Sequence, residues 1–201
     1  MSNDSARSRL RRQLRNARAL LTPAQRIAAA QGLAAQLDAL PEFLIDRRVG
    51  IYWAVQGELA LHAAVAPMRR REQQLFLPVI GAERQLRFAP YTAHSVLAPN
   101  RHGIPEPVVE PEFLVMPEAL ELVLVPLLGF DRRGHRLGFG GGYYDTSFAF
   151  LREGERPREP LLVGIGYAAQ EVDAIAPEPW DIRLDFIATE RELIDCNPVA
   201  A

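Results

Sequence analysis

Residues Leu122–Phe150 read LVLVPLLGFDRRGHRLGFGGGYYDTSFAF, and this stretch contains the pattern that decides the fold. Its first residues, Leu122–Val125, form a continuous apolar run, which is typical of a strand buried on both faces. A turn at Arg133-Gly134 and a glycine-rich loop follow, and a helix is predicted from Tyr143 to Glu153. A buried strand that leads through a loop into a helix is typical of an α/β sheet.

The same alternation extends along the chain on both sides of this stretch. Apolar residues at helical spacing predict two N-terminal helices, and Thr22, Pro23 and Gln25 form a capping signature at the start of the second. The predicted helices span residues 6–21, 23–40, 59–72 (with a kink at Pro67) and 143–153, and the predicted strands span residues 49–53, 75–77, 86–89, 122–125 and 161–165. This order favours an α/β layered sheet that is at least partly parallel.

The remaining segments suggest a single domain. Residues 90–118 are rich in proline and are predicted to be loop with short extended pieces, and residues 153–160 form the one linker-like stretch. We expect one domain over residues 1–201, with the helical segment 1–40 packed on the α/β core.

Composition points to a cytoplasmic protein. Of its 201 residues, 48% are apolar and 24% are charged, as in ordinary soluble proteins. Cys196 is the single cysteine, which excludes an internal disulfide and a multi-thiolate zinc site. No apolar run approaches the roughly 20 residues of a membrane span. Met1–Arg12 lacks the apolar core of a secretory signal, and its helix-core positions argue against a mitochondrial transit peptide.

The sequence contains no lysine, since all 23 basic residues are arginine. A P-loop is therefore excluded, because its lysine contacts the terminal phosphates of the nucleotide, and Schiff-base catalysis is excluded for the same reason. Any phosphate contact must come from arginine, backbone amides or a metal ion. The net charge of −2 favours no particular class of partner.

The glycine-rich loop is the strongest candidate for such a contact. Four glycines among five residues, Gly138 and Gly140–Gly142, let the backbone approach an anion closely and point its N–H groups at it. Arg136 adds a full positive charge, and Asp145 is a potential ligand for Mg²⁺. The alternative is a structural turn with aromatic residues packed under the sheet. A Rossmann fingerprint is disfavoured because residues 129–137 separate the strand from the glycines.

The loop sequence FDRRGHRLGFGGGYYD closely resembles the signature of the 5-formyltetrahydrofolate cyclo-ligase family. Further resemblances extend over nearly the whole chain in the order expected of that family. They are the basic pair Arg7 and Arg11, Trp53 followed by Glu58, the stretch Asn100–Pro107, which resembles the Gly-Ile-x-Glu-Pro motif, and Pro177–Asp181.

The resemblance implies a fold and a reaction. The fold is a three-layer α/β/α sandwich of the NagB/RpiA/CoA transferase-like type, with N-terminal helices. The reaction is the ATP-dependent cyclisation of 5-formyltetrahydrofolate to 5,10-methenyltetrahydrofolate through a phosphorylated formyl group, with Mg²⁺ as cofactor. Its ligands are small molecules, so neither a membrane nor a nucleic acid is expected as a partner, and we expect a monomer.

The resemblance also assigns site residues. ATP contacts fall on Arg7, Arg11, Arg136, Leu137, Gly138, Phe139, Gly140, Gly141, Gly142, Tyr143 and Tyr144. Folate contacts fall on Trp53, Glu58, Phe139, Gly140, Gly141, Gly142 and Tyr143, with Glu58 accepting hydrogen bonds from the pterin ring. The residues expected to be catalytic are Arg136, Gly140 and Tyr143, and the expected magnesium ligands are Asp145 and Asp181. Some members have lysine at the positions of Arg7 and Gly141, so charge neutralisation here depends more on Arg136, Mg²⁺ and the amides.

Two other functions remain open from the sequence. One is a sugar-phosphate isomerase or CoA-transferase-like enzyme on a related fold, which would use the glycine loop for phosphate without ATP. The other is an RNA-binding protein that uses the arginine-rich N-terminal helix as a phosphate-tracking face. His102 and His135 receive no role, because neither has a triad or metal-ligand spacing around it.

Overall fold

The structure is a computed structural model and describes residues 3–152 and 159–197. The α helices are α1 (Asn3–Ala19), α2 (Pro23–Leu37), α3 (Pro41–Ile45), α4 (His62–Arg70) and α5 (Tyr143–Ser147), and the 3₁₀ helices are η1 (Ala82–Arg84), η2 (Pro111–Phe113), η3 (Pro117–Ala119), η4 (Ala149–Leu151) and η5 (Ala168–Gln170). The strands are β1 (Arg48–Gly50), β2 (Gln74–Ile80), β3 (Leu86–Pro90), β4 (Leu97–Pro99), β5 (Pro105–Pro107), β6 (Leu122–Pro126), β7 (Gly129–Phe130), β8 (Arg136–Leu137), β9 (Leu161–Ile165), β10 (Phe186–Ala188) and β11 (Leu193–Asp195).

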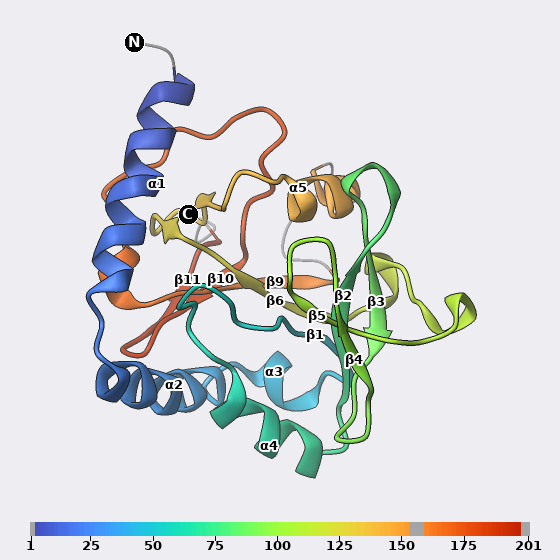
Figure 1. Ribbon diagram of the computed structural model, residues 1–201. Coiled ribbons are helices and arrows are strands. Elements are labelled where there is room, and N and C mark those ends of the chain that lie inside the picture. Colours follow the sequence, from blue (N-terminus) through green and yellow to red (C-terminus); the bar gives the residue numbers. More distant parts are fainter. Residues whose placement is uncertain (1–2, 153–158, 198–201) are drawn as a thin grey trace.

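A seven-stranded sheet forms the centre of the molecule, in the order β11-β10-β9-β6-β1-β2-β3. The five inner strands run parallel, while β3 and β11 at the two edges are antiparallel to their neighbours. Helices α2, α3 and α4 lie below the sheet and α5 lies above it, and α1 stands at one side (Figure 1). The predicted three-layer α/β/α sandwich is therefore confirmed.

Side chains of the central strands alternate between two hydrophobic cores. In β6, Leu122 and Leu124 pack with α2 and α3, while Val123 and Val125 pack in the core that contains Phe148. All four of these strand residues are fully buried. This double burial explains why the strand appears in the sequence as an uninterrupted apolar run.

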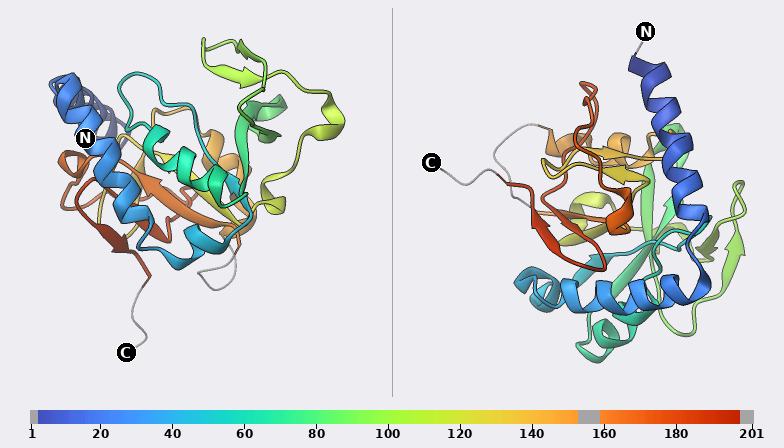
Figure 2. Two further views of the ribbon diagram at one scale, coloured as in Figure 1. Left: turned by 90° about the horizontal axis from the view of Figure 1, so that it is seen from below. Right: turned by 90° about the vertical axis from the view of Figure 1, so that its left-hand side faces the viewer.

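Two predicted helices of the N-terminal segment are confirmed. The chain turns sharply between α1 and α2 (Figure 2), and the turn carries the predicted capping box. The Thr22 hydroxyl accepts from the Gln25 N–H, and the Gln25 side chain accepts from the Thr22 N–H at 2.8 Å. Because these bonds satisfy N–H groups that lack partners within the helix, they fix where α2 begins. The third predicted helix is α4, and it contains Pro67 as expected.

The prediction of a helix from Tyr143 to Glu153 was wrong in its length, because α5 ends at Ser147. The Ser147 hydroxyl donates to the Tyr143 carbonyl at 2.6 Å and accepts from the Leu86 N–H at 2.7 Å. This side chain ties the helix end to β3, and the chain continues as the separate turn η4. The predicted linker over residues 153–160 lies mostly outside the described residues.

Strand β1 is shorter than the predicted strand over residues 49–53. The Ile51 N–H still donates to Phe76, after which the chain leaves the sheet, and Tyr52 donates its hydroxyl to the Leu59 carbonyl. The sequence analysis missed β10 and β11. Among the described helices, none is both long and apolar enough to cross a membrane.

A buried residue of α2 provides a test of the packing in the core between the sheet and helices α2, α3 and α4. Leu33 is fully buried in that core, whereas Leu20, directly after α1, is 82% exposed. We expect Leu33→Ala to lower the free energy of unfolding by about 2–5 kcal/mol, because it removes buried apolar surface and leaves a cavity. The matched variant Leu20→Ala should change it by less than about 0.5 kcal/mol. Urea unfolding measures both, and equal losses would contradict the packing described here.

Candidate active site

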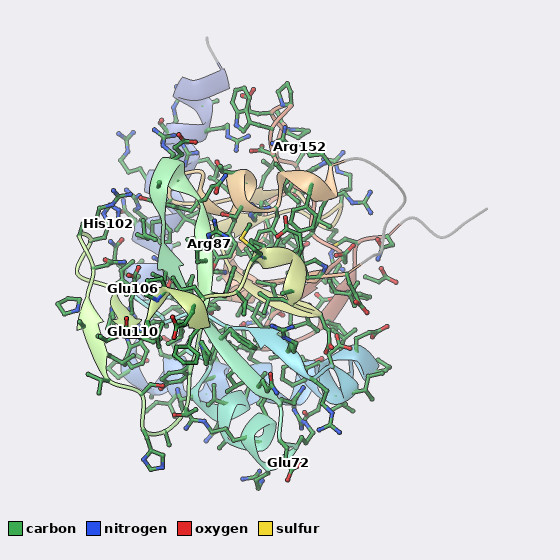
Figure 3. The ribbon with its side chains drawn as sticks, turned by 90° about the vertical axis from the view of Figure 1, so that its right-hand side faces the viewer. Glu72, Arg87, His102, Glu106, Glu110 and Arg152 are labelled. Atoms are coloured by element: carbon green, nitrogen blue, oxygen red, sulfur yellow. The ribbon has the colours of Figure 1, made fainter. Side chains whose placement is uncertain are left out.

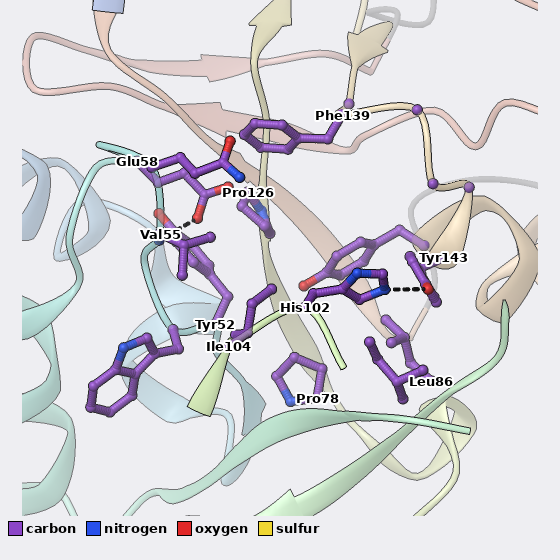
Figure 4. A pocket seen from close by; sticks show the side chains of 18 of the residues that line it. Tyr52, Val55, Glu58, Pro78, Leu86, His102, Ile104, Pro126, Phe139 and Tyr143 are labelled. Carbon is purple, nitrogen blue, oxygen red and sulfur yellow. Dashed lines mark hydrogen bonds between the residues drawn. The ribbon is translucent and has the colours of Figure 1, made fainter. Parts of the chain in front are cut away.

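A cavity of about 650 Å³ opens at the carboxyl ends of the parallel strands. The segment after β1 supplies Tyr52 to Glu58, the end of β6 supplies Pro126, and the glycine loop closes the opposite wall. Ligands of open α/β sheets bind at this edge, outside the carboxyl ends of the strands. Figure 4 shows Glu58, Phe139 and Tyr143 projecting into this cavity.

Nearly all of the predicted site residues meet in this cavity. Those in its wall are Arg7, Arg11, Trp53, Glu58, Arg136, Gly138, Phe139, Gly140, Gly141, Gly142, Tyr143, Tyr144, Asp145 and Asp181. Leu137 does not line the cavity. Its side chain is fully buried beside Leu14, Leu128 and Ile175. Its carbonyl accepts from the Leu128 N–H at 2.8 Å, so it anchors the loop from behind.

The glycine loop follows a β-hairpin whose turn is held by one buried carboxylate. Strands β7 and β8 pair through Gly129 and Phe130, and between them lies Asp131. Asp131 is completely buried and accepts from the backbone N–H groups of Arg133, His135 and Ile175. Burial raises the pKa of Asp131, but the bonds from Ile175 and His135 outweigh it and hold the pKa below its ordinary value.

Two glycines of the loop have backbone angles that favour glycine. Gly140 has φ of +99° and Gly142 has φ of +72°, both in the region that other residues rarely adopt. The loop bends at these positions and returns to the sheet through α5. Since α5 has only five residues, its dipole adds less than the longer predicted helix would.

An ion pair between Arg136 and Asp145 joins the two ends of this loop. The Arg136 Nη2 lies 2.6 Å from Oδ1 of Asp145, and the Arg136 side chain is 6% exposed. Arg136 also donates to the Ile182 carbonyl, while Oδ1 of Asp145 accepts from the Ile182 N–H at 3.1 Å. The pair therefore also binds the segment that carries Asp181.

Helix α1 presents three arginines, Arg7, Arg11 and Arg15, to this cavity, and Arg18 lies behind it. Arg7 donates to Asp181 at 2.8 Å and Arg11 donates to the Gly138 carbonyl at 3.0 Å. The guanidinium groups of Arg15 and Arg18 lie 5.5 and 5.1 Å from the centre of the Phe139 ring. These contacts direct the side chains toward the glycine loop and the segment around Asp181.

Glu58 is the buried acid of the cavity, at 8% exposure. Burial raises its pKa to about 7, although the Val55 N–H, which donates to Oε2 at 2.9 Å, and the charge of Arg18 oppose the increase. The phenols of Tyr52, which is buried, and Tyr144, which is partly buried, have pKa values above the ordinary one, because of burial and then of the nearby Glu58. Glu58 therefore changes charge near neutral pH, while the two phenols stay neutral.

Asp145 and Asp181 are the candidate cation ligands. Within the described part of the chain, the contacts of Asp145 use Oδ1 and those of Asp181 use Oδ2, which leaves one oxygen on each carboxylate. In that same part, no group of three or more His, Cys, Asp or Glu side chains is placed to hold a metal ion. The pair fits Mg²⁺, which commonly binds one or two carboxylates together with phosphate oxygens and water.

The sequence analysis assigned no role to the arm formed by β4 and β5, although the arm completes the cavity wall. His102 and Glu106 lie along this arm (Figure 3). The His102 Nε2 lies 3.0 Å from the Tyr143 hydroxyl, which also accepts from Arg101 at 3.0 Å. Glu106 accepts from the Ile80 N–H at 3.0 Å and so attaches the arm to β2. The Asn100–Pro107 motif was the only sequence signal for this contribution.

Helix α1 contributes two further arginines that the sequence analysis did not single out. Arg15 lines the cavity, while Arg18 lies behind it and donates to the Gln56 carbonyl at 2.9 Å. Their helical spacing from Arg7 and Arg11 was the available signal.

Comparison with known proteins agrees with this geometry. Two relatives carry the name 5-formyltetrahydrofolate cyclo-ligase. The one from Haemophilus influenzae is 28% identical over 184 residues, covering 90% of this chain and 96% of the relative. The one from Escherichia coli is 29% identical over 178 residues, covering 88% and 96%.

A solved structure agrees as well. The NMR structure of Aquifex aeolicus 5,10-methenyltetrahydrofolate synthetase is 28% identical and superposes with a TM-score of 0.81, covering 97% of this chain and 95% of that one. The sequence also matches the family described as 5-formyltetrahydrofolate cyclo-ligase over residues 3–190. The chain therefore belongs to the 5-formyltetrahydrofolate cyclo-ligase family of enzymes.

Proposed function

We propose that the protein converts 5-formyltetrahydrofolate to 5,10-methenyltetrahydrofolate with consumption of ATP, in folate one-carbon metabolism. The observation that carries the proposal is that one cavity joins two kinds of recognition surface. The glycine loop with its arginines suits a polyphosphate, and Glu58 with the aromatic side chains suits a flat ring that bears N–H donors.

The phosphate end of the cavity is built on α1 and the glycine loop. Arg7, Arg11 and Arg136 supply positive charge, and the backbone of residues 138–144 surrounds the phosphates. Arg136 is held by Asp145, so its position is fixed before the nucleotide binds. Fixed charges of this kind stabilise a transferring phosphoryl group without having to reorganise during the reaction.

The folate end is built on the segment after β1. One oxygen of Glu58 is held by the Val55 N–H, which orients the carboxylate to accept hydrogen bonds from the pterin. Trp53 and Phe139 offer ring surfaces, and the Tyr143 hydroxyl lies beside His102 and Arg101. These groups place the formyl oxygen of the substrate toward the phosphate end.

Asp145 and Asp181 would hold Mg²⁺ through the carboxylate oxygens that do not contact the arginines. The ion would supply charge neutralisation on the phosphate oxygens. Arg7 and Arg136, which pair with these same carboxylates, keep them oriented toward the cavity.

The proposed chemistry has two steps. The formyl oxygen attacks the terminal phosphorus of ATP, an O–P bond forms, and ADP leaves. The amine N10 of the folate then attacks the activated formyl carbon, the C–O bond breaks, and phosphate leaves as N10 loses its proton. Arg136 and the loop amides stabilise negative charge on the phosphoryl group in both steps. The Tyr143 hydroxyl, held by Arg101, lies in the same wall and positions the formyl group.

All residues proposed for the site come from one chain, so a monomer would suffice for activity. We propose a monomeric enzyme of the cytoplasm, made as one domain over residues 1–201, that acts on small molecules and requires no membrane or nucleic acid. These proposals rest on the self-contained cavity and on the composition of the chain.

The reaction is tested by the absorbance of the methenyl product in a mixture of protein, 5-formyltetrahydrofolate, Mg²⁺ and ATP. We expect product only with ATP, and Arg136→Ala should lower kcat by about 100-fold or more, because a fixed cation is lost at the phosphoryl group. Arg133→Ala, in the same hairpin but 62% exposed, is the matched control and should retain most activity.

Because Arg136 is buried, Arg136→Lys and a thermal unfolding measurement separate lost catalysis from lost folding. A folded Arg136→Ala variant with normal kcat would contradict the assigned role. Absence of product from the folded parent protein with every substrate present would overturn the proposed function.

The cation site is tested by titrating Mg²⁺. We expect Asp181→Asn to raise the Mg²⁺ concentration for half-maximal rate by about tenfold, because one anionic ligand is lost. Asp173→Asn, an exposed carboxylate outside the cavity, should leave it unchanged. An unchanged Mg²⁺ requirement in Asp181→Asn would place the cation elsewhere.

The raised pKa of Glu58 makes Glu58→Gln informative. The pKa of Glu58 is about 7 in the folded protein, whereas its ordinary value is 4.5. Between these two pH values the folded protein binds the proton more tightly than the unfolded chain does. The free energy of unfolding therefore falls as pH rises from about 4.5 to about 7. We expect Glu58→Gln to be more stable than the parent at about pH 8, by up to about 3 kcal/mol, and nearly equal at about pH 4. Urea unfolding at both values measures this.

The same variant should bind folate more weakly. For the parent, KM for folate should fall as pH rises through about 7, because the ionised carboxylate accepts hydrogen bonds from the pterin. Glu58→Gln should lose this pH dependence. If KM for folate in Glu58→Gln still falls as pH rises through about 7, the group that titrates is not Glu58.

A further inference from the structure

A second cavity, of about 620 Å³, adjoins the active-site cavity and shares Tyr52 and Trp53 with it. It lies between the segment after β1, helix α4 and Tyr91, at the end of β3. Leu61 and Val65 supply much of its apolar wall. A ligand held in the first cavity could therefore extend past Trp53 into the second.

Arg69 gives this second cavity its charge. Its guanidinium carbon lies 5.1 Å from the centre of the Tyr91 ring. Its Nε and Nη2 are buried and have no hydrogen-bond partner, and no ion pair of Arg69 occurs within the described part of the chain. None of the residues that line the cavity is Asp or Glu. Buried donors without partners are costly, so this cation is suited to an anion from outside the protein.

The rest of the wall suits an aromatic group. Trp53 and Tyr91 meet edge to face with their ring centres 6.4 Å apart, and Trp53 keeps 37% of its surface exposed. A flat ring can pack along this aromatic corner, and a carboxylate on a group that is joined to the ring through an amide could then reach Arg69. Pockets that are mainly apolar, with one well-placed polar group, are typical small-molecule sites.

We propose that this second cavity binds the p-aminobenzoyl-glutamate tail of the folate, with Arg69 paired to a glutamate carboxylate. The inference rests on the proposed function and deepens it, because it assigns the part of the substrate that does not react. The pterin occupies the first cavity beside Glu58, and the tail leaves it past Trp53. The planar guanidinium matches a carboxylate through two parallel hydrogen bonds.

The phosphate groups of ATP are the other anions of this reaction, but their place is elsewhere. The glycine loop and the arginines Arg7, Arg11 and Arg15 of α1 line the first cavity, and none of them lines the second. Arg69 is therefore available to the anionic end of the folate.

The test compares substrates that differ only in the tail. Initial rates are measured with 5-formyltetrahydrofolate carrying one glutamate, with the same compound carrying three, and with an analogue in which an uncharged p-aminobenzamide replaces the glutamate-bearing group. The proteins are the parent, Arg69→Gln and Arg70→Gln, since Arg70 is the exposed neighbour that lines neither cavity.

We expect Arg69→Gln to raise KM about tenfold for the glutamate-bearing substrates, with kcat unchanged, because a charge-assisted hydrogen bond that does not take part in the chemistry is lost. KM for the analogue without glutamate should change much less. Arg70→Gln should match the parent with all three substrates, and KM for ATP should stay constant in every variant.

The outcomes separate this inference from the proposed function. Equal KM changes with and without glutamate, or equal effects of Arg70→Gln, would overturn the assignment of Arg69 while leaving the reaction intact. A rise in KM for ATP would assign Arg69 to the nucleotide instead. A folded parent protein that forms no product from any of the three substrates would remove the proposed function, and this inference with it.

Discussion

The ion pair between Arg136 and Asp145 is the contact on which the active site depends. It joins the start of the glycine loop to the helix after it, and both partners also bind Ile182. Because Ile182 follows Asp181, one polar cluster fixes the loop and the second candidate cation ligand together. Breaking a largely buried pair leaves an uncompensated charge, so loss of either partner disturbs all of these elements.

Positive charge in this molecule has both a structural and a binding role. Arg7 and Arg11 attach α1 to the segment around Asp181 and to the glycine loop. Leu14 adds an apolar contact of α1, packed beside Leu128 and Leu137. The position of this helix thus depends on the same side chains that are proposed to meet the nucleotide. Ligand binding and helix docking are energetically linked in such an arrangement.

The sequence predicted the layers of the fold and most of the residues that line the candidate cavity, for identifiable reasons. Leu122–Val125 is buried on both faces, and the glycine loop needs unusual backbone angles, so both leave clear patterns. Strand β10 has only three residues, which are too few to show the alternating apolar pattern of a strand. The end of α5 depends on the hydrogen bond between Ser147 and Leu86, two residues that are distant in sequence. Leu137 lies within the signature, yet its side chain packs behind the loop, because neighbours in a strand face opposite sides.

The carboxylates proposed for Mg²⁺ are already paired with arginines before any ligand arrives. A bare cation approaching Asp145 and Asp181 meets the charges of Arg136 and Arg7, and a bare polyphosphate approaching those arginines meets the two carboxylates. The proposed magnesium–nucleotide complex would bring positive charge to the carboxylate oxygens that do not contact the arginines and negative charge to the arginines at the same time. In the proposed enzyme, this arrangement of charges would favour binding of metal and nucleotide together over binding of either alone.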